Sequence, residues 1–247
     1  MFSLGRELNA YWQSLLRLVY PASCPVCRIP LLLNERYLCS HCTLKIKSIP
    51  DPKCVKCARP LPPYGPTRTL CPVCISKRPA YHRGFALVTY EPQVKTIFHE
   101  IKFQKKPWLL KVFSKLLSDF VHSSLTLTHY DLVVPVPLDW RKARERGFNQ
   151  AELIARMLEK TNSKSKIKVC QMIKKTKKTI PQSQLKRSER LNNLNRAFSI
   201  KRPGEINGKH ILLVDDIFTT GSTVNECARL LKEHGAERVD FFTIARS

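Results

Sequence analysis

The sequence has no run of 18 apolar residues, so it offers no membrane span. Its first twenty residues are hydrophobic, but Arg6, Glu7 and Arg17 interrupt them and no small-residue cleavage site follows, so no secretion signal is expected. Acidic residues are also few: 19 Asp and Glu stand against 43 Lys and Arg, a formal net charge of +24. Together these features predict a cytoplasmic protein that attracts polyanions.

Most of the positive excess lies in one stretch. Residues 141–202 contain nineteen basic residues and four Glu, which partly localises the expected polyanion contact. The alternative is a lysine-rich surface without a partner, because runs such as that at 174–178 are usually solvated loops. Trp140 and Phe148, two aromatic residues in the basic stretch, are expected to pack in the core rather than to stack on bases.

The length of 247 residues accommodates one full α/β domain and a small accessory module. Changes in composition predict three parts: an amphipathic helix within residues 1–22, a Cys-rich module at 23–78 and a main domain at 79–247. The apolar side of the helix either docks on the protein's own core or binds a membrane or a partner.

The main domain alternates strand and helix patterns. Near the C-terminus, residues 210–214 form a continuous apolar run, 222–234 are helical and 238–244 return as a strand. A strand without alternation, followed by a helix and a strand, predicts an α/β fold with a parallel sheet covered by helices on both faces. Further strands are expected at 84–90, 131–136 and 166–172, and further helices at 93–103, 108–122, 148–159 and 184–194.

Eight of the ten cysteines form four C-x-x-C pairs. Each C-x-x-C turn directs two thiolates at one centre, and two turns complete a closed four-cysteine zinc site without an open position for catalysis. The pairs are Cys24/Cys27, Cys39/Cys42, Cys54/Cys57 and Cys71/Cys74.

The Cys-rich module also repeats itself, because C-x-x-C-x-x-Pro-Leu and then Leu-Cys-x-x-Cys occur at 24–42 and again at 54–74. Two copies predict two ribbons, each with its own structural zinc, although the spacing also allows pairing across the repeats. Disulfides are the competing chemistry, but thiols should stay reduced without a secretion signal. Cys170 and Cys227 lie outside the repeats and are expected to be small buried apolar side chains.

The run at 211–223 reads Ile-Leu-Leu-Val-Asp-Asp-Ile-Phe-Thr-Thr-Gly-Ser-Thr. It joins a buried strand to an acidic pair at the carboxyl edge, where open α/β sheets bind ligands. Asp215 and Asp216 offer acceptors for ribose hydroxyls and are the candidate catalytic residues. The turn and helix start that follow offer N–H groups and hydroxyls to a phosphate. They consist of Thr219, Thr220, Gly221, Ser222 and Thr223.

Other phosphate-binding loops fit this run poorly. No Lys precedes the terminal Ser-Thr, as a Walker A loop requires, and no G-x-G-x-x-G pattern is present. The alternative is an ordinary strand-to-helix turn in which Asp and Thr serve as caps. The run resembles the phosphoribosyl pyrophosphate (PRPP) signature of type I phosphoribosyltransferases. This resemblance implies that Asp215 and Asp216 hold the ribose hydroxyls and that residues 219–223 hold the 5-phosphate.

A second phosphate-binding loop is expected at the Val-Pro-Val-Pro turn, residues 134–137. After it, Arg141, Arg144 and Arg146 offer forked donors to a pyrophosphate or to a DNA backbone. Arg190 belongs to a later basic row at helical spacing that either closes over the ligand or follows a DNA backbone. The alternative for these basic residues is a solvent-facing helix.

Four further motifs narrow the resemblance to one family. They are Arg-x-Arg-Gly-Phe-Asn-Gln at 144–150, Thr-x-x-Gln-x-x-Leu at 179–185, Arg-x-x-Asn at 190–193 and Ala-Phe at 197–198. With the Cys-rich front end, this arrangement resembles the ComF family of DNA-uptake proteins, the ComFC or amidophosphoribosyltransferase-like group, over nearly the whole chain. The chain departs from the family at 102–107, where it reads Lys-Phe-Gln-Lys-Lys-Pro and relatives tend to have a Lys, an aromatic residue and a Gly-containing turn.

The resemblance implies a type I phosphoribosyltransferase-like sheet, preceded by a double zinc ribbon, in a cytoplasmic protein of natural transformation. It implies binding of single-stranded DNA, binding of PRPP or a related ribose phosphate with Mg²⁺, and a superfamily-2 helicase as partner. The alternative is an active phosphoribosyltransferase with an unknown acceptor, and a third possibility is a regulatory PRPP sensor. For catalysis, only Glu145 and Glu189 offer acid–base candidates, and surface charge on a helix is the simpler role for both.

Overall fold

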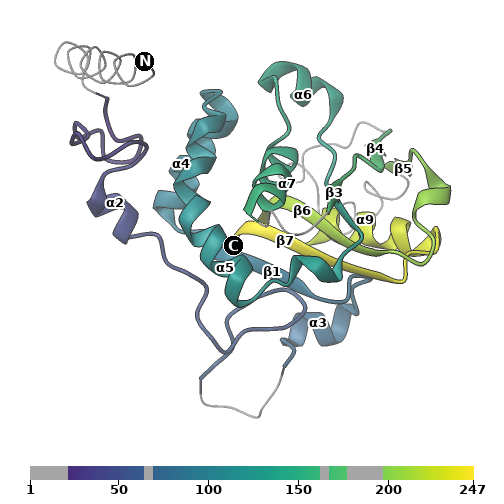
Figure 1. Cartoon of the computed structure of the whole chain (residues 1–247). Helices are drawn as coiled ribbons and strands as arrows, with labels where there is room; N and C mark the ends of the chain where they lie inside the picture. The colour runs from purple at the N-terminus through teal and green to yellow at the C-terminus, as the bar shows by residue number, and fades with distance from the viewer. Residues whose placement is uncertain (1–21, 64–68, 162–166, 177–196) are drawn as a thin grey trace, which may run out of the picture. The chain divides into compact units, whose positions relative to one another are not determined.

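The computed structural model of the chain describes residues 22–63, 69–161, 167–176 and 197–247 (Figure 1). The chain divides into two compact units. One contains the chain up to Lys47 together with Glu91–Val112, and the other contains Ser48–Tyr90 together with Phe113–Ser247. The helices predicted within 1–22 and at 184–194 lie outside the described residues, and the three predicted domain limits stay a prediction.

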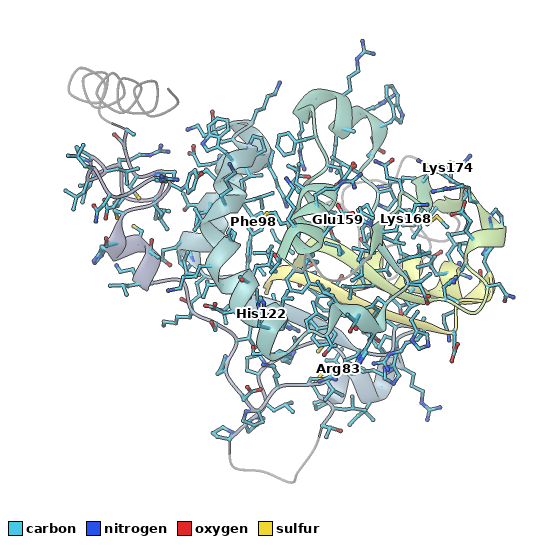
Figure 2. All side chains as sticks on the ribbon, viewed as in Figure 1. Arg83, Phe98, His122, Glu159, Lys168 and Lys174 are labelled. Atoms are coloured by element: carbon cyan, nitrogen blue, oxygen red, sulfur yellow. The ribbon has the colours of Figure 1, made fainter. Side chains whose placement is uncertain are left out.

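The larger unit is built on a five-stranded sheet in the order β1-β7-β6-β2-β3, in which every neighbouring pair is parallel. Its strands are β1 (Gly84–Thr89), β2 (Leu132–Pro135), β3 (Lys168–Val169), β6 (His210–Phe218) and β7 (Arg238–Arg246). All five predicted strands are present, although the one expected at 166–172 is reduced to the two residues of β3. Lys168 is exposed on this edge strand (Figure 2), and a short edge with a lysine resists pairing with other chains.

Helices cover both faces of the sheet, as predicted. The helices of this unit are α3 (Pro72–Lys77), α5 (Ser114–Ser123), α6 (Trp140–Arg146), α7 (Gln150–Thr161) and α9 (Ser222–Glu233), with short 3₁₀ turns η2 (Leu127–His129) and η4 (Pro203–Glu205). Helix α9 shares a core cluster with Leu213 and Phe241 on one face. On the opposite face, the ring of Phe120 in α5 lies 6.0 Å from that of Phe242, and α7 contacts α5, β2 and β6. Neighbouring strand residues such as Phe241 and Phe242 therefore point to opposite faces of the sheet and pack against different helices.

Beside α9 lies a two-stranded antiparallel sheet formed by β4 (Ile173–Lys175) and β5 (Phe198–Ile200), which the sequence analysis did not predict. Helix α6 was also not predicted as a separate element. It begins after Asp139, whose carboxylate accepts the N–H of Arg141 (3.1 Å), and it ends at Gly147 in the left-handed conformation. Among the described residues, no helix has the length and apolar character needed to cross a membrane.

The smaller unit holds α2 (Ser40–Leu44), α4 (Pro92–Phe103) and most of η1 (Pro107–Phe113). The predicted helix at 108–122 is therefore a 3₁₀ segment followed by α5. In the loop before α2, the carboxylate of Glu35 accepts hydrogen bonds from the N–H of Leu32 and from the N–H and hydroxyl of Ser40 (2.9, 2.5 and 2.6 Å). These bonds hold the pKa of Glu35 below its usual value, so Glu35 closes this loop as a carboxylate.

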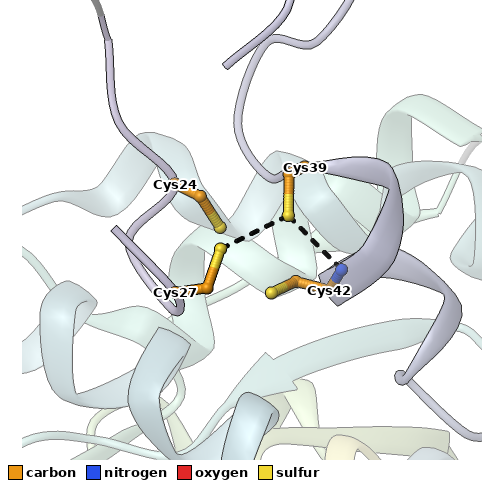
Figure 3. A group of neighbouring side chains, drawn as sticks. All are labelled: Cys24, Cys27, Cys39 and Cys42. Carbon is orange, nitrogen blue, oxygen red and sulfur yellow. Dashed lines mark hydrogen bonds between the residues drawn. The ribbon is translucent and has the colours of Figure 1, made fainter. Parts of the chain in front are cut away.

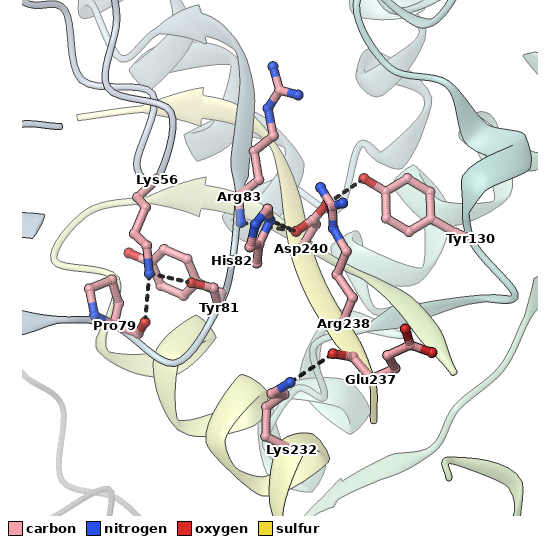
Figure 4. A network of polar contacts seen from close by, with 10 residues as sticks. All are labelled: Lys56, Pro79, Tyr81, His82, Arg83, Tyr130, Lys232, Glu237, Arg238 and Asp240. Atoms are coloured by element: carbon pink, nitrogen blue, oxygen red, sulfur yellow. Dashed lines mark hydrogen bonds and ion pairs between the residues drawn. The ribbon is translucent and has the colours of Figure 1, made fainter. Parts of the chain in front are cut away.

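One buried carboxylate joins the beginnings of strands β1 and β7. Asp240 is fully buried and accepts hydrogen bonds from the hydroxyl of Tyr130 (2.8 Å), the N–H of Arg83 (2.9 Å) and the guanidinium of Arg238 (3.0 Å), as Figure 4 shows. Burial and the nearby Asp240 raise the pKa of Tyr130 well above its usual range, so its hydroxyl remains a donor. This network lies at the amino end of the sheet and leaves the carboxyl edge for the candidate site.

Candidate functional site

The first cysteine cluster brings together the thiols of Cys24, Cys27, Cys39 and Cys42, whose sulfurs all lie within 4.8 Å of one another (Figure 3). The sulfurs of Cys27 and Cys39 are 3.5 Å apart, and the N–H of Cys42 donates to the sulfur of Cys39 (3.4 Å). A tetrahedral ion with Zn–S bonds of about 2.3 Å requires sulfurs about 3.8 Å apart. The donor set therefore fits one closed zinc site.

The second cluster repeats this arrangement with Cys54, Cys57, Cys71 and Cys74, all of them buried. The sulfurs of Cys57 and Cys71 are 3.6 Å apart. In both clusters the residue after the first C-x-x-C has a positive φ, 65° at Arg28 and 54° at Ala58, and its N–H donates to the carbonyl of the first cysteine. The pairing is consecutive within each repeat, as favoured, and not across the repeats. The two clusters support structural zinc at two sites.

The second cluster does more than fold its own ribbon, because it shares the core cluster of the sheet and α9. Tyr81 lies at the centre of this contact, with its ring edge-on to Phe241 (centroids 4.8 Å apart) and to Phe218 (6.3 Å). Arg246 makes a second connection: it donates to the carbonyl of Cys57 (3.1 Å) and places its guanidinium 5.6 Å from the ring centroid of Phe218. The second cluster is thus linked to the last residue of β6, directly before the candidate phosphate turn.

The acidic pair lies within the carboxyl end of β6. Asp215 and Asp216 are both half-buried, and the N–H of Asp216 donates to the carboxylate of Asp215 (2.9 Å) while the N–H of Ile217 donates to that of Asp216 (2.7 Å). Their side chains therefore reach the surface of the strand end and are not enclosed in the core. Both residues lie at the edge where open parallel sheets bind ligands.

The following turn has the geometry of an anion site. Thr219 and Thr220 are exposed, and the hydroxyls of Thr220 and Ser222 lie 2.9 Å apart. Gly221 has φ +75°, and a Cβ on it would lie 2.4 Å from the ring of Phe218. The first hydrogen bond inside α9 runs from Asn225 to the carbonyl of Gly221 (2.8 Å), so the N–H groups of the preceding helix residues, including Thr223, point out of the helix end.

The end of β2 lies beside Val214, directly before the acidic pair. Pro135 is paired with Val214, and the N–H of Val136 donates to the carbonyl of Val214 (2.8 Å). Asn149 fixes the loop that follows, because its amide donates to the carbonyl of Val136 (3.0 Å) and its oxygen accepts the N–H of Ala151 (3.1 Å) at the start of α7. The Val-Pro-Val-Pro turn therefore shares the carboxyl edge of the sheet with the acidic pair.

The basic residues proposed for pyrophosphate or DNA are partly described. Arg141 and Arg144 are exposed on α6 and Arg146 is half-buried at its end, whereas Arg190 lies outside the described residues. Trp140 is 60 % exposed with the guanidinium of Arg141 5.3 Å from its ring centroid, so the expected core position is wrong for this residue. Trp140 begins α6, a helix without a buried residue, so its ring lies with Arg141 on the basic surface.

Lys175 is not among the predicted site residues, because the lysine run that contains it is typical of a solvated loop. Lys175 is half-buried at the end of β4, with its ammonium 6.0 Å from the ring centroid of Phe198. Burial lowers its pKa, while Asp139 opposes that shift and Lys142 adds to it. The pKa of the enclosed Cys227 thiol is raised, mainly by burial and to a smaller extent by Asp215 and Glu226. The same thiol also interacts with Lys175.

Lys175 therefore interacts with Asp139 and Lys142 and with Cys227, and Cys227 interacts in turn with Asp215. The signal that could have found Lys175 is strand alternation, since it shares a strand face with buried Ile173. Cys170 and Cys227 are buried, as predicted.

A double zinc ribbon joined to a phosphoribosyltransferase domain is the class of protein that this fold and site define. Residues 15–75 match the family "Double zinc ribbon domain", and residues 145–247 match the "Phosphoribosyl transferase domain". The sheet begins before the second match, because β1 and β2 belong to it.

The chain is similar over most of its length to three curated proteins. The DNA utilization protein YhgH of Escherichia coli K12 is 32 % identical over 237 residues, which cover 93 % of this chain and 99 % of that protein. Competence protein F of Haemophilus influenzae is 30 % identical (91 % and 96 % covered), and Competence protein ComFC of Bacillus subtilis is 29 % identical (88 % and 87 % covered). The chain belongs to the ComF family, as its motifs predicted.

Proposed function

We propose that the chain binds a ribose 5-phosphate ligand of the PRPP type at the carboxyl end of β6. Asp215 and Asp216 accept the hydrogen bonds of the ribose hydroxyls, and residues 219–223 bind the 5-phosphate through N–H groups and hydroxyls. The observation that carries this proposal is the position of a half-buried acidic pair next to an open turn that begins a helix. Mg²⁺ would accompany PRPP, since it is commonly held by one or two carboxylates together with phosphate oxygens.

The pyrophosphate end of such a ligand would meet the cationic side chains beside the site. Arg141, Arg144 and Arg146 provide forked donors from α6, and the half-buried Lys175 supplies a further positive charge from β4. A partly dehydrated cation interacts more strongly with a phosphate than a fully solvated one, because the local dielectric is lower. We therefore include Lys175 with the arginines in the proposed anion subsite.

The names of the relatives and the charge of the chain support a role in DNA uptake. The relatives are described as DNA utilization and competence proteins, and the net charge of +24 suits a single-stranded DNA partner. A DNA-uptake helicase is the partner that the family resemblance implies, and we propose cytoplasmic action with it. The α6 arginines would then contact either a pyrophosphate or the DNA backbone, and Arg190 would extend that surface.

A PRPP titration followed by calorimetry tests the ligand. The double variant Asp215→Asn, Asp216→Asn is expected to lose more than ten-fold in affinity, because each hydrogen bond to a charged group is worth about 1.5–3 kcal/mol. Asp119→Asn is the control, since it makes the same type of substitution on the exposed surface of α5 and should bind PRPP as the wild type does. Unchanged PRPP affinity in the double variant would exclude the proposed site.

Salt dependence tests the DNA contact. The logarithm of the affinity for an oligothymidylate is expected to fall with the logarithm of salt concentration by about 0.7 per phosphate contacted. Replacing Arg141, Arg144 and Arg146 by Ala should therefore reduce the slope by about 2. Arg156→Ala is the control, because that guanidinium is paired with Glu159 on α7 (3.2 Å). An affinity that does not vary with salt would remove DNA binding from the proposal.

A second candidate function is phosphoribosyl transfer. The placement of the paired carboxylates on β6 and of the basic helix α6 after the neighbouring strand β2 favours it, because a departing pyrophosphate needs positive charge nearby. No acceptor-specific base is evident among the described residues: Glu145 is exposed on α6, and Glu189 lies outside them. Pyrophosphate release during the same PRPP titration, with a panel of acceptor bases, separates this candidate from ligand binding alone.

A further inference from the structure

Two large apolar rings are exposed on either side of one turn in the smaller unit. Phe103, the last residue of α4, is 60 % exposed, and Trp108 at the start of η1 is 50 % exposed. Trp and Phe usually place most of their surface in a core, so two such rings beside one short turn call for an explanation. They belong to neither cysteine cluster and lie in a different unit from the ribose-phosphate turn.

The turn that carries these rings is fixed by Glu100. Its buried carboxylate accepts one hydrogen bond from Lys106 and one from Arg28 of the first ribbon, both 2.8 Å long. Its carbonyl accepts the N–H groups of Gln104 (3.1 Å) and Lys106 (3.3 Å). Burial opposes ionisation of Glu100, but the hydrogen bonds from Lys106 and Arg28 hold its pKa below the usual value. Both ends of the turn are thus attached to one residue, Glu100, through its carboxylate and its carbonyl.

The surface of this segment has one sign of charge. Residues 92–112 contain five lysines, and Glu100 is the only acidic residue among them. Glu100 is buried and paired with Arg28 and Lys106, so of the five lysines it offsets only Lys106. The lysines are Lys95, Lys102, Lys105, Lys106 and Lys111. His99 adds a third ring, 4.9 Å from Phe103 between centroids and one helical turn before it.

We propose that Phe103 and Trp108 form a stacking platform for the unpaired bases of single-stranded nucleic acid, with the neighbouring lysines on its phosphates. Exposed rings interleaved with basic residues are the elements that proteins use for this purpose, because every base has a face to stack and every linkage has a negative charge. Duplex DNA keeps its base faces inside the helix and offers none to the rings. This inference rests on the proposed affinity for single-stranded DNA, and it adds a second binding surface to the one proposed at the α6 arginines.

A membrane surface is the other partner that aromatic and basic residues suit. The turn between the rings is polar, however, with Gln104 and Lys105 exposed, and it would have to enter the interface together with them. An interfacial segment instead presents a continuous apolar face. The positive charge and the polar turn between the rings therefore favour nucleic acid, and vesicle binding becomes a measurable alternative.

The test compares an oligothymidylate with an abasic oligomer of the same length, which has the same phosphates but no bases. In the full chain, Phe103→Ala and Trp108→Ala are each expected to weaken oligothymidylate binding roughly five- to a hundred-fold, the range that stacking one base supplies. Both variants should bind the abasic oligomer as the wild type does, and Phe103→Tyr and Trp108→Tyr should restore binding. Leu44→Ala, at a position 84 % exposed in the same unit, is the control that should change neither affinity.

Three results would overturn the platform: oligothymidylate binding unchanged in both alanine variants, equal losses on both oligomers, or a loss confined to phosphatidylglycerol vesicles. Zinc content and circular dichroism establish that each variant is folded, and the tyrosine variants provide the same comparison if an alanine variant is not. A wild-type chain that binds neither oligomer would overturn the proposed DNA affinity and the platform together. Normal oligomer binding in the alanine variants would remove the platform alone.

Discussion

Cys54→Ser is expected to release one of two zinc equivalents and to abolish PRPP binding. Structural zinc contributes on the order of 10–16 kcal/mol in finger peptides, as much as the whole stability of a domain at about 5–15 kcal/mol. Because the second cluster packs in the core of the sheet and contacts Phe218 through Tyr81, its loss should disturb the turn that follows β6. Zinc analysis, thermal unfolding and PRPP calorimetry on the same sample measure the three effects.

The first cluster supplies the matched control. Cys24→Ser should also release one zinc equivalent, but PRPP affinity should stay within about two-fold of the wild type, since this cluster belongs to the other unit. The comparison separates loss of zinc in general from loss of the support under the phosphate turn. PRPP binding by a zinc-depleted Cys54→Ser chain at wild-type strength would contradict the structural role given to the second cluster.

Gly221→Ala is expected to cost more than ten-fold in PRPP affinity and to lower thermal stability. A non-glycine residue with φ +75° pays roughly 1–2 kcal/mol in backbone energy. The new Cβ would also lie 2.4 Å from the ring of Phe218, and overpacking of this kind costs about 1–3 kcal/mol. Phe218 has little room to move, because it stacks on Phe241 with ring centroids 4.7 Å apart. PRPP calorimetry and the melting temperature report the two effects.

Gly208→Ala separates the backbone effect from the steric one. Gly208 also has a positive φ, +68°, but nothing lies within 4 Å of the position that its Cβ would take. It should therefore lose stability through the backbone alone and keep its PRPP affinity. If both variants bound PRPP equally well, the close approach of Gly221 to Phe218 would have no part in shaping the anion site.

The features that the sequence predicted well are those in which chemistry depends on short spacing. Two thiols in a C-x-x-C turn can reach one metal whatever surrounds them, so both clusters appear as the repeats predicted. The strand and helix around 210–234 are likewise local, since a continuous apolar run and a helical apolar period do not need distant partners to be recognised. The roles of Asp215 and Asp216 in ligand binding stay a prediction.

Other features depended on contacts between distant segments. Lys175 looked like one more residue of a basic loop, and its half-buried position follows from packing of β4 against β5, 23 residues further along at Phe198. Trp140 looked like a core residue by type, yet its helix lies on the surface. The joining of the second ribbon to the sheet also required Tyr81 to meet Phe218 and Phe241, more than a hundred residues away.

The sequence by itself therefore determined the two four-cysteine sites, the parallel α/β core and the family, because each rests on residue types at fixed short spacing. Only the tertiary structure decided that the second cluster packs against Phe218 directly before the phosphate turn, that Lys175 is half-buried near Cys227, and that Phe103 and Trp108 are exposed beside a turn fixed by Glu100. Burial and electrostatic environment arise from the whole folded chain. A local pattern of residues carries no record of which distant side chains will come to surround it.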